Sequence, residues 1–175
     1  MKTLHLLVGI DTEGDNQWDV AARERQTFEN VYALGDLHAR LERRGIRPTY
    51  FVTYPVVTDP RSAEVLGRLL SRGGCEIGAH HHAWETPPCS PDEVRQHPYA
   101  IALPIEQFEE QLGTLTNAVQ RTLGTRPISY RSGRFGFSAA HVSALERAGY
   151  LVESSVAPFF YEVHKGGPDF VGAPP

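Results

Sequence analysis

The chain has 175 residues, of which 41% are hydrophobic and 22% charged, a balance typical of a globular domain with a core of its own. Its formal net charge of -4 gives no electrostatic basis for binding nucleic acid or an acidic membrane surface, so we expect neither as a partner. The N-terminal apolar run is too short for a signal peptide or a membrane span, and the two cysteines, Cys75 and Cys89, predict no disulfide framework. We therefore expect one domain over residues 1–175 in a reduced, cytoplasmic compartment.

The first half of the chain alternates between strand and helix patterns. Residues 4–11 form an almost continuous apolar run, typical of a strand buried on both faces of a parallel sheet. A helix that ends at Gly45 is predicted by apolar residues at helical spacing, namely Phe28, Val31, Leu34, Leu37 and Leu41. Residues 48–54 are rich in β-branched and aromatic side chains and predict a second strand. Asp59 and Pro60 then supply a cap and a first-turn proline for a helix that ends at Gly73-Gly74 and turns inward Val65, Leu66, Leu69 and Leu70.

The second half repeats this alternation. Residues 75–80 predict a third strand, and the proline-rich, aperiodic residues 84–103 predict a long loop. The clearest helical pattern follows and ends at Gly124, with apolar positions at Ile105, Phe108, Leu112, Leu115, Val119 and Leu123. Residues 128–131 predict a short strand, Ser138 caps a helix that ends at Gly149, and residues 150–154 predict a fifth strand.

Repeated strand–helix units predict an α/β protein with parallel strands and right-handed crossovers. A complete eight-stranded barrel usually needs about 250 residues. Five strands in 175 residues therefore predict either an open sheet or an incomplete, distorted (β/α) barrel. Residues 166–175 show no pattern of a closing helix, so we expect the chain to lack the last strands of such a barrel.

Polar side chains gather where the predicted strands end, although the strands themselves are apolar. Asp11 and Glu13 stand at the end of the first strand, and His80 and His82 at the end of the third. The other strands end in Thr53, Arg131 and Ser154. In barrels and open α/β sheets alike, functional sites are built on this carboxyl edge. The sequence therefore predicts a site there.

Three of the eight histidines stand together at residues 80–82. Side chains at i and i+2 of a strand point to the same side, so His80 and His82 can present two imidazoles to one point. With Glu13 they form a two-histidine, one-carboxylate set that leaves positions for water and substrate, as in catalytic metal sites. The metal would lower the pKa of a bound water and polarise a carbonyl oxygen. Asp11 is then the predicted base that accepts the water's proton, and Arg131 is predicted to orient Asp11 through a charge-assisted pair.

Each of these residues also has a plain structural interpretation. The acidic residues 11–15 could form a solvated turn, and Arg131 could make an ordinary surface ion pair. Trp84 is either a packing residue or a wall for a sugar ring, and Ser154 could only cap a turn. For substrate binding we assign Trp84, Arg134 and Ser154. The sequence contains no G-x-S-x-G nucleophile turn and no phosphate-binding glycine loop.

The order of these motifs resembles the polysaccharide deacetylase family, the NodB-homology domain of carbohydrate esterase family 4. The likeness runs from residue 5 to about residue 158 and rests on VGIDTE (8–13), EIGAHHH (76–82), YRSGRFG (130–136) and ESSV (153–156). It implies an incomplete or distorted (β/α) barrel and metal-dependent hydrolysis of an N-acetyl or related acyl group on a sugar. It also implies that Asp11 is the base, that Glu13 and His80 bind the metal, and that Arg131 orients the base.

The chain departs from the family pattern at three places. The second motif of the family usually spaces its histidines four residues apart, but here that position is Trp84. His82 would serve instead, as in a variant branch with an H-x-H-x-W pattern. The usual adjacent aspartates are replaced by Asp11-Thr12, which leaves Glu13 as the acidic ligand. The late histidine that acts as general acid in the family would lie beyond Pro175, and we do not assign that role to His164.

We therefore expect a metal-dependent sugar N-deacetylase-like hydrolase with a carbohydrate substrate and a divalent cation, Zn²⁺, as cofactor. Two other interpretations stay open. One is a non-catalytic carbohydrate-binding remnant of the same fold, and the other is a metal hydrolase of a different amide, such as a cyclic amide. The sequence predicts neither the particular sugar nor the oligomeric state.

Overall fold

The computed structural model describes residues 5–17, 19, 25–96 and 98–173. Its strands are β1 (Gly9–Thr12), β2 (Thr49–Val52), β3 (Glu76–His81), β4 (Ser129–Ser132) and β5 (Val152–Glu153). The α-helices are α2 (Glu29–Tyr32), α3 (Leu34–Glu42), α4 (Tyr54–Thr58), α5 (Pro60–Arg72), α6 (Pro91–Gln96), α7 (Ile105–Leu123) and α8 (Val142–Arg147). Short 3₁₀ helices cover Ala100–Ala102, Gly133–Phe135, Ala139–His141 and Val163–Lys165.

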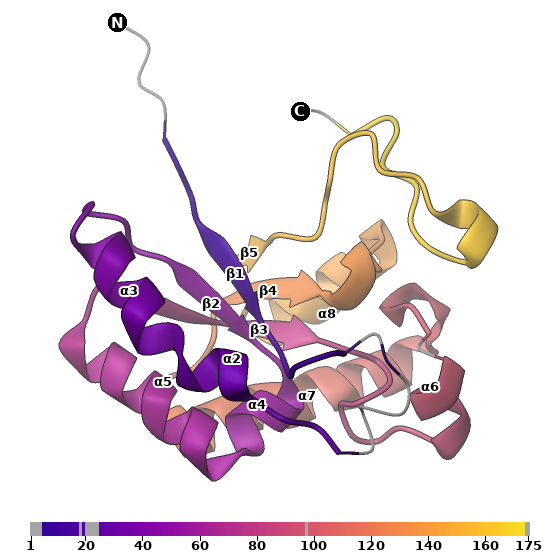
Figure 1. The fold of residues 1–175 in the computed structure, drawn as a ribbon. Coiled ribbons are helices and arrows are strands. Elements are labelled where there is room, and N and C mark those ends of the chain that lie inside the picture. Colours follow the sequence, from indigo (N-terminus) through magenta and orange to yellow (C-terminus); the bar gives the residue numbers. More distant parts are fainter. Residues whose placement is uncertain (1–4, 18, 20–24, 97, 174–175) are drawn as a thin grey trace, which may run out of the picture.

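The strands form one parallel sheet in the order β1-β2-β3-β4-β5, so each strand pairs with the next one along the chain. The sheet does not close, because β1 and β5 lie at its two edges. In Figure 1 the strands occupy the centre, the helices α3, α5 and α7 lie together beside them, and the C-terminal segment, in yellow, lies apart from these helices. The prediction of an α/β protein whose parallel strands do not close into a complete barrel is confirmed.

The two faces of the sheet carry different side chains, because successive side chains of a strand point to opposite faces. One face packs against α5 and α7 in the hydrophobic core and carries Ile10, Tyr50, Val52, Ile77, Ala79 and Tyr130. The opposite face lines an open cavity of about 280 Å³ and carries Gly9, Thr49, Phe51, Glu76, Ser129 and Arg131. The polar strand-end residues continue this second face.

Several helix boundaries agree with the sequence. The helix α7 begins at Ile105 and ends at Leu123, and Gly124 follows in the left-handed conformation with φ 70°. The Asp59 side chain caps α5 by accepting a hydrogen bond of 2.7 Å from the backbone N–H of Ser62. Local capping chemistry therefore fixes these helix ends.

Other expectations were wrong. The helix expected between Phe28 and Leu41 is split at Ala33 into α2 and α3. In α3 the side chain of His38 is buried, whereas that of Leu37, expected to face the core, is 40% exposed. The His38 Nδ1 atom lies 3.1 Å from the Tyr50 hydroxyl, so the buried imidazole has a polar partner. The segment expected to be one long loop contains α6 and a 3₁₀ turn.

The first strand is not buried on both faces. The assigned strand begins at Gly9, and before it Leu6 and Leu7 are 74% and 91% exposed. Among the described residues, β1 pairs with β2 alone and lies at one edge of the sheet. Leu4, at the start of the predicted strand, lies outside the described residues.

Within the described part of the chain, no helix is both long and apolar enough to cross a bilayer. Cys75 and Cys89 are both free thiols.

Candidate metal centre

The histidine run divides between the two faces of the sheet. His80 and His81 end β3 and His82 follows it, so His80 and His82 share the face opposite the core. His81 points to the helix face, where its ring packs edge-on against Phe108 of α7 with 5.4 Å between centroids. The i, i+2 spacing therefore brings two imidazoles together, as expected from the sequence.

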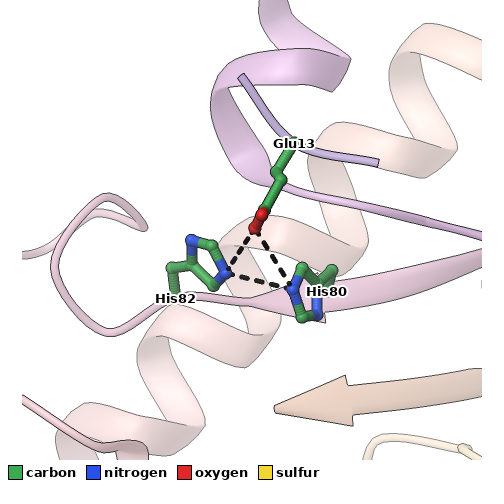
Figure 2. A group of neighbouring side chains, drawn as sticks. All are labelled: Glu13, His80 and His82. Carbon is green, nitrogen blue, oxygen red and sulfur yellow. Dashed lines mark hydrogen bonds and ion pairs between the residues drawn. The ribbon is translucent and has the colours of Figure 1, made fainter. Parts of the chain in front are cut away.

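Three potential ligand atoms converge at this edge of the sheet. Glu13 Oε2 lies 3.2 Å from His82 Nε2 and 3.6 Å from His80 Nε2, and the two Nε2 atoms are 3.0 Å apart (Figure 2). These three residues form the one group of His, Cys, Asp or Glu side chains in the described ranges whose ligand atoms meet the spacing required of a metal site. The arrangement can hold a divalent cation on two nitrogens and one oxygen.

Glu13 reaches the histidines from a turn after β1 that is held in place by hydrogen bonds to residues of α2. The Asn30 side-chain amide donates a 2.9 Å hydrogen bond to the Glu13 carbonyl. Asp15 accepts hydrogen bonds from the backbone N–H groups of Glu29 (2.8 Å) and Asn30 (3.2 Å) at the start of α2. The acidic segment is therefore tied to α2, and the alternative of a simple solvated turn does not describe it.

The outer nitrogens of both imidazoles are engaged, which determines what their inner nitrogens can do. His80 Nδ1 lies 3.0 Å from the Arg131 carbonyl, which can only accept, so this nitrogen carries the proton. His82 Nδ1 lies 2.7 Å from Glu85 Oε1, again an acceptor. In the neutral rings both Nε2 atoms then carry lone pairs, and two lone pairs 3.0 Å apart repel unless a cation lies between them. The donor set therefore fits a metal ion.

Without a metal, a proton takes the place of that cation. Burial alone would lower the pKa of His82, but the carboxylates of Glu85 and Glu13 outweigh it and raise the pKa to about 9. Burial alone would raise the pKa of Glu13, but hydrogen bonds from His80 and His82 hold it well below its usual range. The carboxylates of this site thus stabilise a positive charge between the imidazoles, whether a proton or a metal ion carries it.

Asp11 and Arg131 form a pair beside this group. Arg131 Nη1 donates a 2.6 Å hydrogen bond to Asp11 Oδ1, while Asp11 Oδ2 lies 4.0 Å from His80 Nε2. Arg131 is itself held by the carbonyl (3.1 Å) and the hydroxyl (2.8 Å) of Ser154, and its guanidinium lies 4.2 Å from the centroid of the Phe51 ring. One oxygen of Asp11 is therefore fixed, and the other faces the candidate metal ligands.

The two carboxylates of the centre are more exposed than its two imidazoles. The side chains of His80 and His82 are 4% and 2% exposed, whereas those of Glu13 and Asp11 are 24% and 36% exposed. A substrate can therefore approach over the two carboxylates while the imidazoles stay covered by protein.

The backbone after β4 covers His82 from another side. A Cβ atom added to Gly133 would lie 2.2 Å from His82 Cδ2 and 2.9 Å from its Nε2. The third sequence motif therefore contributes a glycine whose lack of a side chain makes room for a candidate ligand.

The three residues assigned to substrate binding have other contacts. Trp84 is 2% exposed and stacks on His82 with 4.2 Å between ring centroids, which fits the packing alternative and leaves no open ring face for a sugar. The Ser154 hydroxyl accepts from Arg131. Arg134 donates to the Tyr99 hydroxyl (2.8 Å) and lies over the Tyr99 ring. Ser154 therefore contacts the site indirectly, through its hydrogen bond with Arg131, and Trp84 packs against the ring of His82.

Two buried residues that support the histidines were missed from the sequence. The neutral His81 is held by Gln111 of α7, whose Oε1 lies 2.7 Å from His81 Nε2 and whose amide donates to the carbonyls of Ala83 (3.1 Å) and Pro88 (2.7 Å). Burial lowers the pKa of His81 to about 3. Glu85 faces His82, and its place three residues after that histidine was the available signal.

No family model matches the sequence, and no curated protein matches it. Solved structures do match. A protein from Mycobacterium smegmatis assigned as a polysaccharide deacetylase is 18% identical over 86% of this chain and 50% of its own, with a TM-score of 0.64. A family 4 carbohydrate esterase from Streptomyces lividans, solved in complex with acetate, is 14% identical over 83% of this chain and 60% of its own, with a TM-score of 0.54.

The same fold also occurs in a protein with another activity. The 4-alpha-glucanotransferase from Thermococcus litoralis is 18% identical over 84% of this chain and 22% of its own, with a TM-score of 0.57. The chain spans 50% of the Mycobacterium smegmatis protein and 60% of the Streptomyces lividans esterase. At these identities the likeness establishes the fold, which is that of the polysaccharide deacetylases, and function has to be argued from the site.

Proposed function

We propose that this chain is a metal-dependent hydrolase that removes an N-acetyl or related acyl group from a carbohydrate. The observation that carries the proposal is the convergence of Glu13, His80 and His82 beside the paired Asp11 and Arg131. It is supported by the fold, which the chain shares with a family 4 carbohydrate esterase solved in complex with acetate. We also propose that residues 1–175 belong to a single domain of this type.

We further propose that the second motif is of an H-x-H-x-W type, in which His82 replaces the histidine usually found four residues after His80. The stacking of Trp84 on His82 supports this assignment, because the tryptophan fills the space behind the substituted ligand. Zn²⁺ is the proposed metal, since two imidazoles and one carboxylate form a donor set that it favours.

The proposed chemistry divides between the metal and the protein. A divalent cation held by Glu13, His80 and His82 supplies a lowered pKa for bound water and polarisation of an acyl carbonyl. Asp11 accepts the proton of the attacking water at Oδ2, the oxygen that Arg131 leaves unbonded. Arg131 fixes the direction of that oxygen and balances the charge of the carboxylate.

The test uses the purified chain and measures bound metal together with acetate release from acetylated chitooligosaccharides. Asp11→Asn should reduce turnover by about 10²- to 10⁴-fold, the usual contribution of a general base, and leave the metal content unchanged. Asp36→Asn, at an exposed position on α3, is the control and should leave both unchanged. Equal turnover in wild type and Asp11→Asn would refute the role of Asp11.

The same measurements separate the other interpretations. Metal binding without turnover of any acetylated sugar would favour the non-catalytic carbohydrate-binding remnant. Turnover of a cyclic amide but of no acetylated sugar would favour a metal hydrolase of another amide.

A further inference from the structure

Glu85 is a buried carboxylate to which the proposed chemistry assigns no task. Its side chain is 9% exposed, and it lies on the turn after β3, where the backbone N–H groups of Glu85 and Thr86 both donate to the His82 carbonyl (3.3 and 3.1 Å). This turn sets the Glu85 side chain beside the His82 ring. Because an ionised carboxylate is costly to bury, its partners have to explain it.

The two oxygens of Glu85 face different parts of the chain. Oε1 lies 2.7 Å from His82 Nδ1, the nitrogen on the far side of the ring from the candidate metal position. Oε2 accepts hydrogen bonds from the side-chain amides of Gln17 (3.2 Å) and Gln26 (3.1 Å). The two amides donate to one oxygen and the other oxygen lies at ion-pair distance from a ring nitrogen, so the surroundings of Glu85 suit an ionised carboxylate.

The two glutamines connect Glu85 to the other end of the metal group. A Cβ atom added to Gly14 would lie 3.1 Å from Gln26 Cγ and 3.2 Å from Gln17 Nε2, so both amide side chains pack against the residue that follows Glu13. Glu85 thus contacts His82 directly and contacts the Glu13 turn through the two glutamines.

The charge balance of the metal site also gives Glu85 a role. With both imidazoles neutral, Glu13 and Glu85 together carry two negative charges in a largely buried site, and a divalent cation balances them. Without the charge of Glu85, one positive charge of the cation would be left unbalanced by these two carboxylates.

We propose that Glu85 is the positioning residue of this site, holding both His82 and the Glu13 turn in place for a divalent cation. The inference rests on the metal centre of the proposed function. It adds a residue that touches neither metal nor substrate, and it links the first and second sequence motifs. Carboxylates that orient a metal-bound histidine typically contribute 10- to 100-fold to metal affinity.

The experiment compares Zn²⁺ dissociation constants, measured by competition with a chromophoric chelator, for the full chain and three variants. Glu85→Gln removes the negative charge. The side-chain amides of Gln17 and Gln26 can rotate so that their oxygens accept hydrogen bonds from the new amide. Glu93→Gln is the matched control, because Glu93 also accepts from a glutamine, Gln107 (2.7 Å), and its contacts with the described residues include no histidine. Gln26→Leu removes one link to the Glu13 turn and leaves Glu85 in place.

We expect Glu85→Gln to weaken Zn²⁺ binding by 10- to 100-fold, Gln26→Leu to weaken it by a smaller factor, and Glu93→Gln to leave it within twofold of wild type. The visible absorption of bound Co²⁺ should also change in Glu85→Gln, a readout that a purely structural role would not move. Thermal unfolding of the metal-free proteins shows whether each variant is folded.

Three outcomes overturn the proposal or one part of it, and they can be told apart. If wild type binds Zn²⁺ and folded Glu85→Gln binds it equally well, Glu85 is not a positioning residue and the proposed function stands. If wild type binds neither Zn²⁺ nor Co²⁺, the proposed function fails and this inference fails with it. Should Glu85→Gln not fold, unchanged affinity in Gln26→Leu overturns the link to Glu13.

Discussion

Gly133→Ala tests whether His82 has to occupy its present position. Gly133 follows β4, and its backbone has no positive φ that would strain an alanine, so any effect of the substitution comes from contacts alone. The new Cβ would stand 2.2 Å from His82 Cδ2, where ordinary contacts begin at 3.4 Å, so the ring would have to move by more than 1 Å.

Such a displacement is large for a metal ligand. Ligand distances in metal sites hold to within about 0.2 Å, and the buried His82 ring is enclosed by Trp84 on one face and Glu85 at its outer nitrogen. We therefore expect Gly133→Ala to weaken Zn²⁺ binding by more than about 100-fold, exceeding the effect of changing a residue that only orients a ligand.

The assay is competition for Zn²⁺ with a chromophoric chelator, and circular dichroism checks that the variant is folded. Gly113→Ala is the matched control, because a Cβ atom at this α7 position meets nothing within 4 Å. Alanine in a helix interior should stabilise the control by about 1 kcal/mol and leave Zn²⁺ affinity unchanged. If folded Gly133→Ala binds Zn²⁺ as tightly as wild type, His82 is not a ligand held at that position.

Three further predictions concern stability. The pKa of His81 is about 3 in the folded protein and 6.5 in the unfolded chain, so the unfolded chain binds more protons between pH 3 and pH 6.5. The free energy of unfolding should therefore fall as the pH falls from 6.5 toward 3, by up to about 1.4 kcal/mol per pH unit. Urea titrations of the metal-free protein at pH 6.5 and 5 should show this loss, and an equal loss in His81→Asn would contradict the assignment to His81. Zn²⁺ at 100 times its dissociation constant should raise the free energy of unfolding by about 2.7 kcal/mol, and excess chelator should reverse this; an unchanged melting temperature would argue against a metal site in the folded state. Leu66→Ala, at a fully buried position of α5, should cost about 2–5 kcal/mol in urea unfolding, and Leu37→Ala, at a position 40% exposed, should cost much less; similar costs would contradict the described core.

Much of the fold follows from local patterns. The apolar period of α7 and the glycine after it predict that helix to the residue, and the Asp59-Pro60 pair predicts where α5 begins. Local patterns fail where a helix breaks or where burial depends on a neighbour. The pattern around Leu7 predicts a buried strand, yet Leu7 is 91% exposed, because burial depends on segments that are distant in the sequence.

The candidate site also has features that follow from local sequence and features that do not. The sequence by itself determined that His80 and His82 share one side of a strand, because that follows from the two-residue period of β-structure. Only the tertiary structure decided that Glu13 turns toward both imidazoles, that Arg131 bonds Asp11 across 120 residues, and that Glu85 stands behind His82. These contacts depend on strand order, on register and on the paths of the turns, and those are set by packing of the whole sheet against its helices.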